Sequence, residues 1–221
     1  MSLGYACVNM QLSYPQQYGG KEKGVDRITT GRKMIKRTFK AKGVDYASEI
    51  VLKNVIDLEK IVDWNILKGY KLFRISSSMI PWKTEYDWSD LKDIEEIKMY
   101  LHSAGVKAKS HGLRLTTHPG QFNVLTSPHE HVVENAVKDL TINGEVFDMM
   151  GLSRTPYNKI NIHAGGAYGD KQSALDRFCK NFERLPDSVK TRLTVENDDK
   201  ASMYSVEDLY HGIYNRIGLP I

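Results

Sequence analysis

Three residues whose side chains are common metal ligands stand at the ends of three short runs of strand-forming residues. The stretches are RLTTH, KINIH and RLTVE, and they end at His118, His163 and Glu196. Imidazole nitrogens and a carboxylate suit zinc, manganese or iron, whereas magnesium and calcium sites are built from oxygen. A cation held in this way would lower the pKa of a bound water and neutralise charge on a phosphodiester. The pattern predicts a metal centre in which these three residues are both the ligands and the catalytic groups.

A single histidine more often makes a structural hydrogen bond than binds a metal, so each residue alone is a weak indication. Three ligand types at equivalent positions of successive segments favour the metal. His129 and His131 stand two residues apart near the start of a predicted helix and do not share a face. We expect both on the surface.

A Pro-Gly turn follows the first of the three ligands and carries Gln121 and Phe122. An amide beside an exposed aromatic ring on a rigid loop could enter a stacked duplex, where the ring stacks on a base. The alternative is that Phe122 folds into the core under the loop, and the sequence leaves both open. Tyr5 and Asn9, on the first predicted strand, could line the same site.

The segments that must position these residues alternate between strands and helices. Strands are predicted at 3–10, 71–77, 114–118, 159–163 and 192–197, and helices at 45–68, 93–103, 130–150, 173–185 and 206–217. Gly105 is expected to end the second helix. Such alternation implies a parallel sheet, in a closed barrel or an open doubly wound fold. The phosphate fingerprint of the doubly wound nucleotide-binding sheet is missing after the first strand, which favours the barrel.

In a parallel barrel the C-terminal ends of the strands converge on one mouth, where active sites lie. We count five strand-helix units and the start of a sixth strand. Eight units at this spacing would need about 300 residues, and the chain has 221. We therefore expect a single α/β domain over 1–221, the N-terminal part of a (β/α)8 TIM barrel that is incomplete at its C-terminus.

The net charge of +4 is concentrated in one segment, a predicted basic loop over 19–43. Within it, 21–42 holds nine basic residues against Glu22 and Asp26. Such a loop favours a polyanion beside it by releasing counterions, which makes nucleic acid a candidate partner. The alternative is a solvated loop without a partner.

No window approaches the roughly 18 unbroken apolar residues of a membrane span, and the N-terminus lacks the build of a secretion signal. We expect a cytoplasmic protein without a membrane partner. Cys7 and Cys179 have neither the spacing of a metal knuckle nor the number of a disulfide framework.

Longer stretches around these residues resemble the UV damage endonuclease family. They are LGYACVN, FRISSSMIPW, LTTHPGQFNVL, VVENAVKDL, KINIHAGGAYGDK and RLTVENDD, and the resemblance runs from Leu3 to Ile221. It implies a barrel of the xylose-isomerase-like type and a manganese-dependent enzyme that holds two or three divalent ions. It also implies damaged double-stranded DNA as substrate, nicked immediately 5′ of pyrimidine dimers, 6-4 photoproducts and also abasic sites, which leaves a 3′-hydroxyl and a 5′-phosphate.

The resemblance implies roles for the residues named above. The metal-ligand positions of the family fall on His118, His163 and Glu196, the last as the expected bridge between metals. Its lesion-contacting positions fall on Gln121, Phe122, Tyr5 and Asn9.

The sequence departs from the family pattern in two ways. Ser78 stands where some members carry a histidine, and the family continues past the position of Ile221 into strands that supply further ligands. Two other functions therefore stay open. One is a module that binds damaged DNA without cutting it, because the metal shell would be incomplete. The other is a sugar isomerase on the same barrel, against which the basic segment and the loop aromatic argue.

Overall fold

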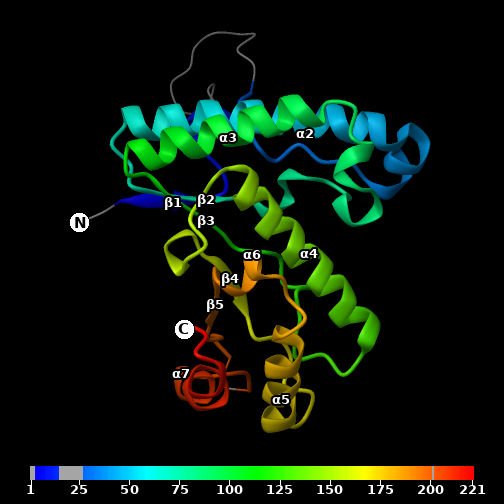
Figure 1. Ribbon diagram of the computed structural model, residues 1–221, viewed down its shortest axis with the longest axis vertical. Coiled ribbons are helices and arrows are strands. Elements are labelled where there is room, and N and C mark those ends of the chain that lie inside the picture. Colours follow the sequence, from blue (N-terminus) through cyan, green and yellow to red (C-terminus); the bar gives the residue numbers. More distant parts are fainter. Residues whose placement is uncertain (1–2, 15–26, 201) are drawn as a thin grey trace. The chain divides into compact units, whose positions relative to one another are not determined.

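The computed structural model describes residues 3–14, 27–200 and 202–221. In this part of the chain five strands form a sheet in the order β1-β2-β3-β4-β5 (Figure 1). The strands are β1 (Gly4–Ala6), β2 (Leu72–Ile75), β3 (Arg114–Thr117), β4 (Ile160–His163) and β5 (Leu193–Glu196). The pairs β1–β2, β3–β4 and β4–β5 are parallel. Doubly wound sheets reverse their strand order at a switch point, so the sequential order is that of the predicted barrel type.

Helices follow the strands as predicted, and two further short helices, Met10–Ser13 and Asp187–Lys190, were not predicted. They are α1 (Met10–Ser13), α2 (Lys36–Leu67), α3 (Ile94–Ser110), α4 (Glu130–Met149), α5 (Lys171–Phe182), α6 (Asp187–Lys190), α7 (Val206–Leu209) and α8 (Asn215–Ile217), with a π-helical turn, Tyr210–Tyr214, between the last two. No helix of the described residues is long and apolar enough to span a bilayer.

The chain divides into two compact units. The first comprises Met1–Thr116 with Met149–Leu152, and the second comprises Thr117–Asp148 with Ser153–Ile221. The assignment of 1–221 to one domain stays a prediction.

In the first unit α2 and α3 lie side by side (Figure 1). The residues that α2 buries recur three and four apart, as the sequence predicted: Ala47, Val51, Val55, Leu58 and Val62. The prediction that Gly105 ends the next helix is wrong, because α3 continues to Ser110. A Cβ added at Gly105 would lie 1.8 Å from the carbonyl oxygen of Met150. This glycine therefore allows a close approach of two backbone segments.

The basic segment is only partly a loop. Residues 27–35 have no helix or strand, whereas α2 begins at Lys36, so the prediction of a loop is wrong for 36–42. Residues 19–26 lie outside the described residues. The two helical turns before Asp45 were missed because Gly43 interrupts the helix with a φ of 69°, a conformation that favours glycine.

In the second unit the strands have the burial expected of strands covered on both faces. All of β4 and β5 except the last residue of each is buried. Arg192, immediately before β5, is fully buried and donates hydrogen bonds to the carbonyls of Ser153 and Ser188. The Val195 N–H of β5 donates to the carbonyl of Pro220, a residue beyond α8, at 3.0 Å. The last residues of the chain thus run beside β5, where the start of a sixth strand was predicted.

Candidate metal centre

The three predicted ligands lie in the second unit, and the register of its strands brings them together. In the β4–β5 pair, His163 lies directly opposite Glu196. Paired residues of neighbouring parallel strands are about 4.8 Å apart and point to the same face. His118 follows β3 directly, and Thr117 before it pairs with Ile160 at the start of β4.

One carboxylate oxygen lies against both imidazoles. Glu196 Oε1 is 2.8 Å from His118 Nε2 and 3.1 Å from His163 Nε2. One potential ligand atom from each residue lies within 4.8 Å of the other two. The side chains are 18%, 39% and 40% exposed for His118, His163 and Glu196, respectively. The cluster is therefore open enough for a water or a phosphate to reach it.

The donor set fits a divalent transition metal. Nitrogen and oxygen ligands bind such ions at about 2.1 Å, so neighbouring ligand atoms lie about 3 Å apart, close to the separations seen here. His118 Nδ1 lies 3.0 Å from the carbonyl oxygen of Pro119. A carbonyl only accepts, so Nδ1 carries a proton, and in the neutral imidazole, the form that binds a metal, the lone pair of Nε2 faces Glu196. A cation would satisfy both of these facing acceptors.

Neighbouring side chains lower the pKa of Glu196. Partial burial by itself would raise the pKa of the Glu196 carboxyl. The hydrogen bond and charge of His118, the charge of His163 and a hydrogen bond from Asn161 outweigh it and hold the pKa below its usual range. The carboxylate is therefore ionised at neutral pH, as a ligand must be.

A buried polar relay orients the same carboxylate. Asn161 Nδ2 donates to Glu196 Oε2, and Thr194 Oγ1 donates to Asn161 Oδ1. Asn161 and Thr194 are both buried. Sequence reasoning missed them. They stand two residues before His163 and Glu196, which is the same-face spacing of a strand, and that spacing could have pointed to them.

The loop after His118 is anchored, and its tip is exposed. Asn123 Nδ2 donates to the Gly120 carbonyl at 3.0 Å and to Asp139 at 2.8 Å. From α5, Asn181 donates to the carbonyl of Leu125. Phe122 is 80% exposed, so the alternative in which it folds into the core is wrong. Gln121 beside it is also exposed.

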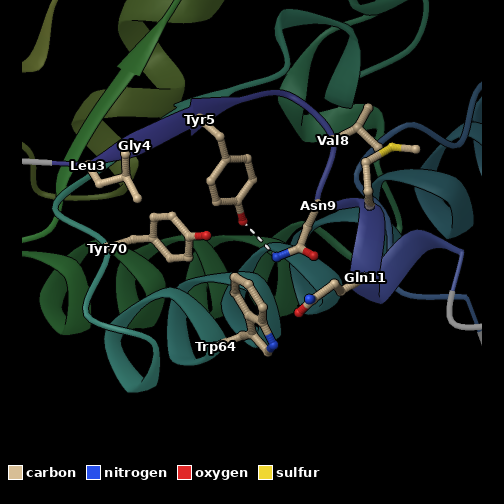
Figure 2. Close-up of a pocket in the computed structure, with 9 residues that line it drawn as sticks. Leu3, Gly4, Tyr5, Val8, Asn9, Gln11, Trp64 and Tyr70 are labelled. Carbon is tan, nitrogen blue, oxygen red and sulfur yellow. Dashed lines mark hydrogen bonds between the residues drawn. The ribbon is translucent and has the colours of Figure 1, made fainter. Parts of the chain in front are cut away.

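Tyr5 and Asn9 lie in the first unit and contact each other. Asn9 Nδ2 donates to the Tyr5 hydroxyl at 2.7 Å, and both line a cavity of about 450 Å³ with Trp64 and Tyr70 (Figure 2). The rings of Trp64 and Tyr70 are stacked with centroids 5.6 Å apart. Burial raises the pKa of Tyr5, although the hydrogen bond from Asn9 opposes it. This aromatic cavity was not foreseen.

Comparisons with known proteins agree on one family. The model of the family described as UV-endonuclease UvdE matches residues 1–221. The chain is 36% identical over 210 residues to the UV-damage endonuclease of Schizosaccharomyces pombe, and the match covers 94% of this chain and 33% of that protein. It is 32% identical over 221 residues to the UV DNA damage endonuclease of Clostridium perfringens, which covers 100% of this chain and 48% of that protein. The chain thus spans less than half the length of these two relatives.

A solved structure described as "Crystal Structure of SacUVDE" is similar to the whole chain, with a TM-score of 0.82 and 27% sequence identity, and the match covers 68% of that structure's chain. Together with the sequential parallel strands, this similarity confirms the predicted TIM-barrel type of fold with five βα units.

Proposed function

The chain belongs to the UV-endonuclease UvdE family, and on that premise we propose that it carries the metal-binding and lesion-contacting residues of a DNA repair endonuclease. The substrate would be double-stranded DNA with pyrimidine dimers, 6-4 photoproducts or abasic sites, nicked 5′ of the lesion. The observation that carries the proposal is the convergence of His118, His163 and Glu196 on one another within the second unit.

We propose Mn²⁺ as the ion, held by the two Nε2 atoms and a Glu196 oxygen. A divalent ion in such a site supplies an activated water and offsets negative charge on the phosphodiester. The chain's own residues prepare the site for it. Glu196 brings a charge that survives to acid pH because His118, His163 and Asn161 lower its pKa. The partial exposure of the cluster leaves room for a backbone phosphate.

Recognition of damage would fall to the exposed tip of the anchored loop. Phe122 presents a ring to solvent on a backbone tied down by Asn123. A photoproduct has already weakened stacking, which reduces the few kcal/mol needed to open the duplex there. Stacking of a base on an aromatic ring contributes about 1–3 kcal/mol.

The described part of the basic segment, residues 27–43, supports a nucleic-acid partner. Its exposed cations among the described residues include Lys33, Lys36, Arg37, Lys40 and Lys42. Contacts of such cations with phosphates release counterions and make binding depend on salt. We therefore propose that this segment contributes to binding the DNA backbone.

Nicking of UV-irradiated plasmid in the presence of Mn²⁺ tests the proposal. We expect irradiated plasmid to be nicked and untreated plasmid to be spared. H163A should abolish nicking because a ligand is lost, whereas H129A, at an exposed histidine outside the cluster, should behave as the unmodified protein. Equal nicking of irradiated and untreated plasmid would contradict the proposal.

Three ligand residues among those that the structure describes form only a partial metal shell, which favours a second candidate, a module that binds damaged DNA without cutting it. Salt-dependent binding of irradiated duplex without nicking would identify that module. In either case F122A should weaken binding of irradiated duplex by about tenfold or more and leave Mn²⁺ binding unchanged. Turnover of an aldose would instead support the sugar isomerase.

A further inference from the structure

The two ring nitrogens of His163 face different carboxylates. Nε2 lies 3.1 Å from Glu196 Oε1, in the proposed metal centre. Nδ1, on the other side of the ring, lies 3.3 Å from Asp198 Oδ1. Nδ1 is buried, as is the second oxygen of Asp198, Oδ2, and neither has a hydrogen-bond partner among the described residues. A buried polar group without a partner is costly. A small rotation of either side chain would let His163 Nδ1–H donate a hydrogen bond to the Asp198 carboxylate.

The position of Asp198 is set by backbone and by a buried tyrosine. Its N–H donates to the carbonyl oxygen of Tyr204 at 3.1 Å. The hydroxyl of Tyr204 in turn donates to the carbonyl of Gly166 at 3.1 Å. Tyr204 is fully buried. It therefore ties the loop after β5, which carries Asp198, to the loop after β4, which begins just beyond His163.

Asp198 is not part of the ligand cluster itself. The ligand atoms that lie within 4.8 Å of one another come from His118, His163 and Glu196. The Asp198 carboxylate lies against Nδ1 of His163, on the side of the ring away from Glu196, and its side chain is 17% exposed. A carboxylate in that position fixes the tautomer and the orientation of a metal-binding histidine. The equivalent position at His118 is taken by the Pro119 carbonyl, 3.0 Å from Nδ1.

We infer that Asp198 is a positioning residue of the metal centre, whose carboxylate keeps the proton of His163 on Nδ1 and turns the lone pair of Nε2 toward Glu196. This inference rests on the proposed metal site and adds a residue to it. The hydrogen bond that it requires is charge-assisted, and such bonds are roughly twice as strong as neutral ones.

The test measures Mn²⁺ affinity by titration calorimetry for the unmodified chain, D198A, D198N and D199A. D198A should bind Mn²⁺ about 10- to 100-fold more weakly. D198N should retain most of the affinity, because its amide oxygen still accepts from Nδ1–H. D199A, at the exposed neighbour, should match the unmodified chain. Melting of the metal-free variants checks that each is folded.

Nitrogen chemical shifts of His163 in the metal-free protein, recorded at pH 8, give an independent readout of its tautomer. We expect the Nδ1–H tautomer in the unmodified chain and in D198N, and a mixture in D198A. Equal Mn²⁺ affinity and an unchanged tautomer in D198A would overturn the inference. If the unmodified chain binds no Mn²⁺, the proposed metal centre fails, and the tautomer alone decides the role of Asp198.

Discussion

At the scale of single residues, the candidate centre is built from pairs that meet across the sheet. His118 and Glu196 are 78 positions apart in the chain, yet their side chains are 2.8 Å apart. Glu196 is held on its second oxygen by Asn161, which Thr194 holds in turn. Such buried polar chains specify one arrangement because every member loses a partner when one moves. The site is therefore as much a property of the polar residues beneath it as of the three ligands.

A second carboxyl, the half-buried Asp139, supports the exposed loop. Asp139 on α4 accepts a hydrogen bond from Asn123 Nδ2 at 2.8 Å. Burial raises the pKa of Asp139, and the bond from Asn123 opposes that shift only in part. The loop that presents Phe122 is thus anchored to a group that takes up a proton more readily than an exposed aspartate.

This shift predicts a pH dependence of stability. Because the folded-state pKa of Asp139 lies above the unfolded value, the folded state binds the proton more tightly. Protonated Asp139 therefore contributes to the free energy of unfolding. This contribution is fully present below the unfolded-state pKa, about 3.9, and is lost as the pH rises through the raised folded-state pKa. D139N has no carboxyl to ionise at this position and so does not lose this contribution. The difference in urea midpoint, D139N minus the unmodified chain, should therefore increase from pH 4 to pH 7. The same change at the exposed Asp199 is the control, and a difference that stays constant with pH would contradict the prediction.

At the scale of elements, two glycines in helices of the first unit have opposite reasons for being there. Gly105 lies in the middle of α3 and faces the Met150 carbonyl, against which an added Cβ would clash at 1.8 Å. Gly43 interrupts α2 with a positive φ, and nothing lies within 4 Å of an added Cβ. The first glycine is required by packing and the second by backbone conformation.

Alanine substitutions separate the two reasons. G105A should cost more than about 3 kcal/mol of unfolding free energy, because two backbones must move apart. G43A should cost about 1–3 kcal/mol, because a φ of 69° with a ψ of −164° is a backbone conformation almost restricted to glycine. Urea denaturation of the two variants provides the comparison. Similar losses of unfolding free energy in both variants would mean that Gly105 tolerates a side chain. They would contradict the close approach of α3 to the Met150 carbonyl.

At the scale of the whole molecule, the sheet that the described residues form has β1 at one end and β5 at the other. The β5 side is partly occupied, since Val195 N–H bonds to the Pro220 carbonyl. Beside β1, Leu3 is 63% exposed and contributes to the aromatic cavity lined by Tyr5 and Trp64. Unprotected edge strands with apolar side chains pair readily with other chains.

We therefore predict that the isolated chain self-associates through β1. L3K should place a charge at that edge and weaken association by about tenfold, equivalent to about 1.4 kcal/mol. L67K, at a residue 80% exposed on the last turn of α2, should not change association. Size-exclusion chromatography over a range of concentrations measures both. A sharp monomer peak of the unmodified chain, with cooperative melting, would rule the prediction out.

The sequence by itself determined the alternation of elements and the identity of the candidate ligands. Both follow from local periodicity, which repeats every two residues in a strand and every 3.6 in a helix. His118, His163 and Glu196 could be found because each ends a strand-like run. The same local rules failed at Gly105, where the controlling contact is with Met150, far along the chain.

Only the tertiary structure decided which side chains meet. It placed Phe122 in solvent rather than in the core, linked Asn161 to Glu196 and set Asp198 against the far nitrogen of His163. These outcomes depend on strand register and on loops tied together by residues such as Tyr204. A register shift of one residue would turn every such side chain to the other face, and no local pattern in the sequence records that choice.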